Sequence, residues 1–174
     1  PSKALAGVGV AFYLLANLSS HRSKLSKSSS KISDYLDLVA LGTYADVASL
    51  DYNNRILVDA GLKRIQRKQC RAGISALLDI AGRDPAQLKA QDLGFVLGPR
   101  INAAGRMETM DIGIECLLAN DLQTAYPLAQ QLNQLNIERR HVEADMKQQA
   151  LSALASLSLD SAQLPAALIL FEPH

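Results

Sequence analysis

The stretch Leu97-Gly98-Pro99-Arg100-Ile101-Asn102-Ala103-Ala104-Gly105-Arg106 sets two arginines and an asparagine among residues too small to cover them. Small neighbours let a backbone approach a phosphate closely, and a guanidinium offers a planar fork to phosphate oxygens. The stretch therefore predicts a phosphodiester contact made by Arg100, Asn102, Gly105 and Arg106. The spacing fits equally well a capped helix whose arginines pair with Glu108 or Asp111.

A second stretch, Leu41-Gly42-Thr43-Tyr44-Ala45-Asp46, offers one carboxylate in similarly small surroundings. Apolar periodicity predicts a helix over residues 34–46, which brings Asp46 near its C-terminal end. A carboxylate there meets the negative end of the helix dipole, a conflict expected where a cation compensates, as at a metal site. A single Asp at a helix end is also a common cap or surface residue. We interpret the two stretches as parts of one site.

The composition bounds the class of protein. The 174 residues, 48% of them apolar, suffice for one sizeable domain or a domain with an appendage. The 18 basic and 17 acidic side chains give a net charge of +1, so overall charge does not indicate a nucleic-acid partner. Aromatic residues make up 5% and Trp is absent, which argues against an aromatic base-stacking platform such as an OB barrel.

The cysteines and the apolar runs indicate the compartment. Cys70 and Cys116 lie singly in apolar helical patterns, as expected for buried thiols in a reducing cytosol. The chain lacks a signal-peptide pattern, and its longest apolar runs are too short to span a bilayer. We expect a cytoplasmic globular protein without a membrane partner.

Helical periodicity covers most of the chain. It predicts helices over residues 3–18, 34–46, 55–67, 73–81, 91–103, 111–119 and 121–157. The first should be buried on most faces. Asn53 should cap the third. The fifth should be interrupted or begin afresh at Gly98-Pro99 and stop at Gly105.

Two basic segments lie between these helices. Residues 19–33 hold eight serines and four basic side chains, which fits either a solvated linker or a guide for polyanions. The basic residues 63–71 fit charge compensation at a helix end, or a binding patch.

The last predicted helix is long and polar, on the order of 45 Å at about 1.5 Å per residue. Such a helix more often bridges two domains than lies inside one. Residues 160–165 form a linker in this interpretation, and Leu168-Ile169-Leu170-Phe171 forms a strand that opens the next domain. Because a lone strand has no ladder partner, we expect the chain to be a fragment of a longer protein.

Four segments in this order, residues 4–14, 37–47, 53–57 and 97–106, resemble the RecJ exonucleases of the DHH phosphoesterase superfamily. The resemblance implies a mainly α fragment of an α/β DHH phosphoesterase domain. Residues 1–120 would be the C-terminal part of that domain, 121–159 a connecting helix, and 160–174 the start of the DHH-associated C-terminal domain. The substrate would lie between the two domains.

The resemblance also assigns residues. The family motif Gly-Thr-x-Ala-Asp falls on residues 42–46, so Asp46 is the candidate ligand of a catalytic Mn²⁺ or Mg²⁺. The motif at residues 98–106 resembles the family's contact to the DNA backbone. Tyr44 and Ala48-Ser49 depart from the usual residues, which concerns local packing. The other metal ligands, an Asp-x-Asp pair, a further Asp and the Asp-His-His signature, are expected before Pro1.

The implied chemistry is two-metal phosphodiester hydrolysis, with hard oxygen ligands that suit Mn²⁺ or Mg²⁺. We expect part of a single-stranded-DNA-specific 5′-to-3′ exonuclease of recombination and repair, with a single-strand-binding protein and a helicase as partners. The fragment itself should be inactive, because one carboxylate cannot hold two cations. The alternatives are another DHH phosphoesterase, acting on short oligonucleotides or cyclic dinucleotides, and a non-catalytic DHH-like scaffold of replication.

Overall fold

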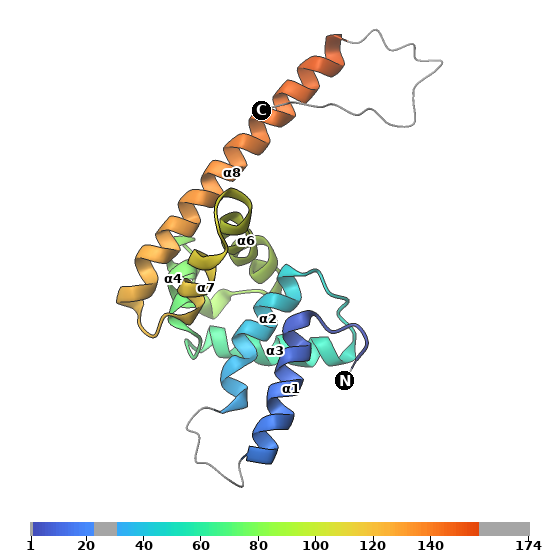
Figure 1. Cartoon of the computed structure of the whole chain (residues 1–174), viewed down its shortest axis with the longest axis vertical. Coiled ribbons are helices and arrows are strands. Elements are labelled where there is room, and N and C mark those ends of the chain that lie inside the picture. The colour runs from blue at the N-terminus through green and yellow to red at the C-terminus, as the bar shows by residue number, and fades with distance from the viewer. Residues whose placement is uncertain (1, 23–30, 157–174) are drawn as a thin grey trace. The chain divides into compact units, whose positions relative to one another are not determined.

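The computed structural model describes residues 2–22 and 31–156, and every regular element within these ranges is helical (Figure 1). The elements are α1 (Gly7–Arg22), the 3-10 helix η1 (Ile32–Tyr35), α2 (Leu36–Ala45), α3 (Tyr52–Gln66), α4 (Ala72–Ile80), the 3-10 helix η2 (Pro85–Gln87), α5 (Ala90–Asp92), the π-helix η3 (Leu93–Leu97), α6 (Gly98–Met107), α7 (Asp111–Leu118) and α8 (Leu122–Ser156). The mainly helical prediction is confirmed. The predicted linker and strand after residue 159, and most of the serine-rich segment, lie outside the described residues.

The chain divides into two units, residues 1–136 and 137–174, with the boundary inside α8. In the first unit, α1 and α2 run side by side and α3 crosses them (Figure 1). In the second unit, residues 137–156 form the C-terminal part of α8, and most of their side chains are exposed. The long helix predicted over residues 121–157 is thus observed, and its role as a connector between domains stays a prediction.

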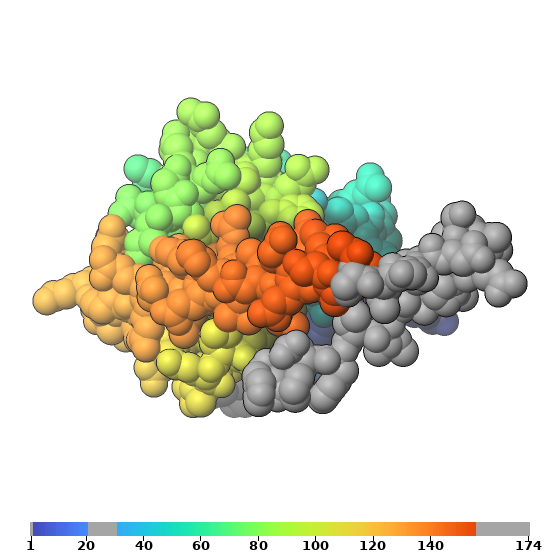
Figure 2. Space-filling view, turned by 90° about the horizontal axis from the view of Figure 1, so that it is seen from above, coloured from blue at the N-terminus to red at the C-terminus, as the bar shows by residue number. Residues whose placement is uncertain are grey.

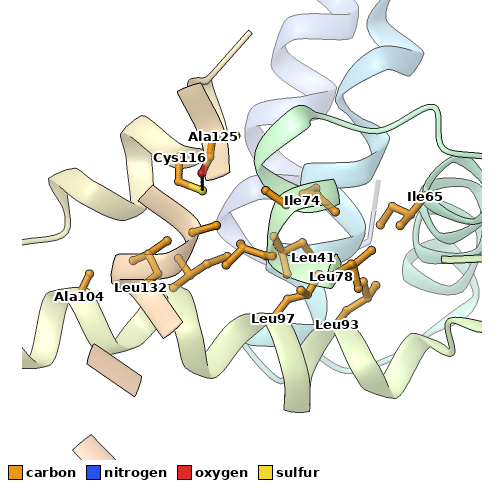
Figure 3. Close-up of a cluster of buried hydrophobic side chains, with 14 of the residues drawn as sticks. Leu41, Ile65, Ile74, Leu78, Leu93, Leu97, Ala104, Cys116, Ala125 and Leu132 are labelled. Atoms are coloured by element: carbon orange, nitrogen blue, oxygen red, sulfur yellow. Dashed lines mark hydrogen bonds between the residues drawn. The ribbon is translucent and has the colours of Figure 1, made fainter. Parts of the chain in front are cut away.

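The core of the first unit is one cluster of aliphatic side chains from seven helical elements. Its fully buried members include Ile65, Ile74, Leu77, Leu78, Leu93, Leu97 and Leu132 (Figure 3). Burial of each such side chain stabilises the fold by about 1.5 to 3 kcal/mol. The segment from α4 to α6, coloured from green to yellow-green, also contributes a continuous part of the surface seen in Figure 2. This segment therefore joins the core to one face of the molecule.

The helices α2 and α3 pack with their backbones in close approach at Gly61. A Cβ atom at this position would overlap the carbonyl oxygen of Leu36 and lie 2.6 Å from the Cβ atom of Ala40. Since both neighbours belong to α2, a side chain at position 61 would push the two helices apart. Gly61 thus sets the position of the helix that ends at Asp46.

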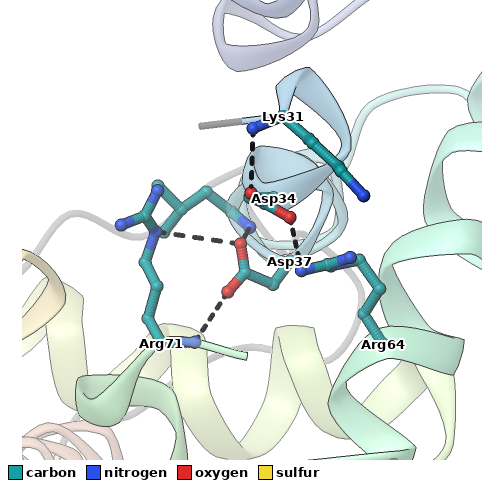
Figure 4. Close-up of polar contacts among 6 residues, drawn as sticks. Lys31, Asp34, Asp37, Arg64 and Arg71 are labelled. Carbon is teal, nitrogen blue, oxygen red and sulfur yellow. Dashed lines mark hydrogen bonds and ion pairs between the residues drawn. The ribbon is translucent and has the colours of Figure 1, made fainter. Parts of the chain in front are cut away.

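Buried and half-buried ion pairs anchor the start of α2 (Figure 4). The Asp37 carboxylate, 1% exposed, accepts a hydrogen bond from the Arg71 backbone N–H at 2.8 Å and lies 3.8 Å from Arg71 Nε. The Arg71 guanidinium lies 5.0 Å from the ring centroid of Tyr35. Arg64 donates to Asp34 at 3.0 Å. Two of the basic residues in segment 63–71 therefore hold η1 and α2 in place.

The predicted burial of α1 on most faces is wrong for the described residues. The side chains of Val10, Leu14, Leu15 and Leu18 are between 45% and 61% exposed. Only one side of the helix packs on α2, where Val8 lies against Gly42. Apolar periodicity shows that a helix can be covered, but it does not show which neighbour covers it.

The predicted cap of α3 is also wrong. Asp51 caps the helix, because its Oδ1 accepts a hydrogen bond from the Asn54 N–H at 2.9 Å. Asn53 lies inside the first turn, and its Oδ1 accepts a hydrogen bond from the Tyr13 hydroxyl at 2.6 Å. Asp and Asn cap helices about equally well, so tertiary contacts decided between them.

We predict that Gly61→Ala lowers the free energy of unfolding by at least about 2 kcal/mol, because the added methyl group overpacks the α2–α3 contact. Gly7→Ala is the matched control: a Cβ atom at Gly7 has no neighbour within 4 Å, so we expect a change within about 0.5 kcal/mol. Urea unfolding followed by circular dichroism measures both. Equal stabilities of the two variants would contradict the proposed role of Gly61.

Candidate functional site

The candidate phosphate-binding stretch lies on a helix that changes type without breaking. The Gly98 N–H donates to the Leu93 carbonyl, which closes one π turn, and α6 follows directly. Pro99 has no N–H, and in a regular α-helix its ring would clash with the carbonyl of residue 95. The wider π turn precedes it and accommodates the ring. The predicted interruption at Gly98-Pro99 is therefore a change of helix type.

The predicted stop at Gly105 is wrong, since α6 continues to Met107. The Glu108 N–H donates to the Ala104 carbonyl at 2.8 Å and closes the helix. A glycine inside a helix costs about 1 kcal/mol relative to alanine. Burial of the adjacent Ala103 and Ala104 in the core outweighs that cost.

The continuous helix η3–α6 has an inner and an outer face. Leu93, Leu97 and Ala104 point into the core (Figure 3). Asn102, Gly105 and Arg106 are exposed, and Asn102 and Arg106 lie one helical turn apart on the same side. The structure thus brings three of the four predicted phosphate-binding residues together on the outer face.

Arg100 lies on a different side of the helix, about 120° from Arg106 at 3.6 residues per turn. Its NH1 donates to the Val96 carbonyl at 2.7 Å and its Nε donates to Asn133 Oδ1 at 3.0 Å. Arg100 therefore ties α6 to the first half of α8. The sequence also allowed Glu108 or Asp111 to pair with the arginines of this stretch. Within the described residues, neither acid forms an ion pair with Arg106.

Asp46 lies at the C-terminal end of α2, as predicted. It is the C-cap, its N–H donates to the Gly42 carbonyl at 3.0 Å, and its side chain is exposed. The last turn of α2 packs on η3–α6: Cβ atoms built at Gly94 and Gly98 would lie 3.2 Å from the Tyr44 carbonyl oxygen and 3.4 Å from the Ala45 Cβ. The two stretches singled out in the sequence are therefore neighbours in space.

The residue after Asp46 has a strained backbone. Val47 has a φ of 52° and is 88% exposed. Its N–H donates to the Tyr44 carbonyl at 3.2 Å, and the Ala48 N–H donates to the Thr43 carbonyl at 3.1 Å. These two bonds form a Schellman cap, in which glycine is the usual residue with positive φ. A β-branched residue in this conformation is a steric outlier.

A buried asparagine holds the loop that follows. Asn54 is 0% exposed, and its Nδ2 donates to the carbonyls of Ala4 and Ser49, both at 2.8 Å. This residue ties the loop after Asp46 to the N-terminal segment. The sequence offered a weak signal for it, a polar pair at the start of an otherwise regular helix, but only the structure shows its partners.

The residues present do not by themselves fit a two-metal site. In the described ranges, no group of three or more His, Cys, Asp or Glu side chains could hold an ion. Asp46 supplies a single exposed carboxylate. Cys116 is buried, and burial raises its pKa to about 11; burial also raises the pKa of Cys70. Both thiols are therefore protonated at neutral pH and are poor metal ligands or nucleophiles.

The helices of the described part are too short or too polar for a membrane-crossing role.

The relatives found by sequence comparison share one name. No model of a known protein family matches the chain. It is 49% identical over 180 residues to the single-stranded-DNA-specific exonuclease RecJ of Dickeya dadantii and 45% identical to that of Escherichia coli, and each match covers 100% of the chain. The chain spans 31% of the length of these relatives.

Solved structures agree with this similarity. A crystal structure of exonuclease RecJ bound to manganese matches 88% of the chain with a TM-score of 0.75 and 35% identity, over 37% of its own length. RecJ of Thermus thermophilus in complex with Mg²⁺ matches 83% of the chain with a TM-score of 0.72 and 37% identity, over 22% of its own length.

We predict that Val47→Gly raises the free energy of unfolding by about 1 kcal/mol. Glycine removes a left-handed strain of about 1 to 2 kcal/mol, and its greater freedom in the unfolded chain offsets part of this gain. Lys68, with a φ of 57° in an equivalent cap of α3, is the comparison. Since Lys is not β-branched, Lys68→Gly should stabilise less. Urea unfolding measures both, and a destabilised Val47→Gly variant would contradict the assignment of strain.

Proposed function

We propose that the chain, which is similar in sequence and fold to a segment of the RecJ exonucleases, is part of a single-stranded-DNA-specific 5′-to-3′ exonuclease of recombination and repair. The observation that supports the proposal is the packing of the last turn of α2, which ends at the exposed Asp46, against Gly94 and Gly98 of η3–α6. The outer face of η3–α6 holds Asn102 and Arg106. One hard oxygen ligand and donors suited to a phosphate thus lie on two helices that are in contact.

In this proposal the outer face of α6 binds the DNA backbone. The Arg106 guanidinium and the Asn102 amide donate to phosphate oxygens, and Gly105 leaves room for the strand to approach. Arg100 lies on a different side of the helix, where its guanidinium donates to Val96 and Asn133, so its proposed contact to the DNA backbone would be made outside this face. Because the net charge of this chain is only +1, we propose that this segment contributes such local contacts rather than a general positive field.

The metal requirement follows from the same relatives, since the structures of RecJ contain Mn²⁺ or Mg²⁺. We propose that Asp46 supplies one carboxylate ligand and that residues outside this chain complete a site for two Mn²⁺ or Mg²⁺ ions. Paired ions would activate a water and stabilise the leaving oxygen. The chain by itself would be inactive, because the described residues offer too few ligands.

The domain assignment belongs to the proposal as well. Residues 1–120 would form the C-terminal part of a DHH phosphoesterase domain. Residues 121–159 would be the helix that connects it to the DHH-associated domain, which would begin with residues 160–174. The continuity of α8 from Leu122 to Ser156 supports the connecting role. We further propose a cytoplasmic location, single-stranded DNA as the bound partner, and a single-strand-binding protein and a helicase as functional partners.

We predict that Arg106→Ala in the full-length protein weakens binding to single-stranded DNA and reduces the salt slope of log K by about 0.7, the value for one phosphate contact on a single strand. Arg83→Ala removes an equal charge from an exposed loop residue after α4 and should leave the slope unchanged. Fluorescence anisotropy at several salt concentrations measures both. Equal slopes for wild type and Arg106→Ala would mean that Arg106 is structural.

We predict that Asp46→Ala in the full-length protein abolishes metal-dependent hydrolysis and leaves folding intact, because Asp46 is exposed and only its backbone contributes to the helix end. Asp59→Ala, which removes an exposed carboxylate on α3, is the control and should retain activity. Release of labelled nucleotides and circular dichroism are the measurements. Turnover of Asp46→Ala at the wild-type rate would remove this residue from the site.

A further inference from the structure

The π turn presents an aromatic ring to solvent. Phe95 is 81% exposed, although burial of an aromatic side chain contributes about 1.5 to 3 kcal/mol to stability. Its neighbours on the same turn, Leu93 and Leu97, are fully buried. Two leucines of this turn are therefore buried in the core, while Phe95, its largest apolar side chain, is exposed to solvent.

Phe95 lies on the exposed side of the same continuous helix, η3–α6, as two candidate phosphate-binding residues. Phe95, Asn102 and Arg106 are exposed, whereas Leu93, Leu97 and Ala104 are buried. The three exposed residues form an outer stripe about 16 Å long at about 1.5 Å per residue. The stripe faces away from Leu93, Leu97 and Ala104, which point into the core (Figure 3).

This combination suits a single strand of nucleic acid. Such strands offer a charged backbone and unpaired bases with open faces, and proteins bind them with cationic groups and with aromatic rings on which bases stack. The other fully described aromatic side chains with high exposure differ: Tyr52 lies on α3 and the Tyr126 hydroxyl donates to Asp79 at 2.8 Å. Among the exposed rings of the described residues, Phe95 is the one that lies on η3–α6, the helix that carries the phosphate donors.

We propose that Phe95 stacks on a base of the strand whose backbone contacts Asn102 and Arg106. This inference rests on the proposed function and extends it to the choice of substrate. A base paired within a duplex has both faces covered by its neighbours, so stacking on Phe95 requires an unstacked base. Every base has a π face, so the contact selects single strands without selecting a sequence.

The test compares oligonucleotides with and without bases in the full-length protein. Binding is measured by anisotropy in EDTA, with a labelled oligothymidylate and with an abasic deoxyribose-phosphate strand of equal length. Phe95→Ala should weaken binding to oligothymidylate by about 5- to 150-fold, the range for loss of one base–aromatic stack. It should leave binding to the abasic strand and the salt slope unchanged. Phe95→Tyr should retain the wild-type affinity.

Leu118→Ala is the matched control, since Leu118 is an apolar side chain that is 65% exposed and belongs to α7 rather than to η3–α6, and it should bind as wild type does. Equal losses on both strands, or a Tm lowered by several degrees in Phe95→Ala, would show that Phe95 packs against protein and would overturn the proposal. Unchanged binding of oligothymidylate by Phe95→Ala would overturn it as well and leave the proposed function intact. Failure of the wild-type protein to bind oligothymidylate would overturn the proposed function itself.

Discussion

The close approach of α2 to its neighbours is the constraint on which the candidate site depends. At its start, the buried Asp37 carboxylate binds the backbone of Arg71. Along its length, Gly61 of α3 allows backbone contact. At its end, Gly94 accommodates the Tyr44 carbonyl oxygen. Three separate parts of the chain thus fix one ten-residue helix, and Asp46 takes its position from the end of that helix.

The sequence predicted most of the helices because each carries its own apolar period. The α8 helix was expected over residues 121–157 and runs from Leu122 to Ser156. Predictions failed where the outcome depends on another element. Which face of α1 is exposed depends on the neighbouring elements that cover the other face. Asp51 rather than Asn53 caps α3, because the Asn53 side chain accepts a hydrogen bond from Tyr13. The π turn depends both on Pro99 and on the packing of η3 in the core, so no local sequence pattern predicts it.

The candidate site was predictable from the sequence where it depends on local residue types, and not where it depends on contacts between helices. Local residue types pointed to Asp46 and to the stretch ending at Arg106, and packing of α2 on η3–α6 brings the two together. Helical geometry, which is available from spacing alone, separates Arg100 from Arg106 by about 120°. The sequence did not predict a role for Phe95, because a lone aromatic residue in an apolar stretch cannot be distinguished from a core residue until its exposure is known.

The strain at Val47 shows how the loop after α2 is held. In the described ranges, α2, α3 and α4 end in Schellman caps, with Val47, Lys68 and Gly82 at the position of positive φ. Of these three caps, the one beside Asp46 carries a β-branched residue, whose side chain is 88% exposed. Such a conformation persists because its surroundings determine it: Asn54 binds the Ser49 carbonyl, and Arg55 Nε donates to the Leu50 carbonyl at 2.7 Å. These contacts hold the loop that follows Asp46, and a fixed backbone is what the proposed role of Asp46 as a metal ligand requires.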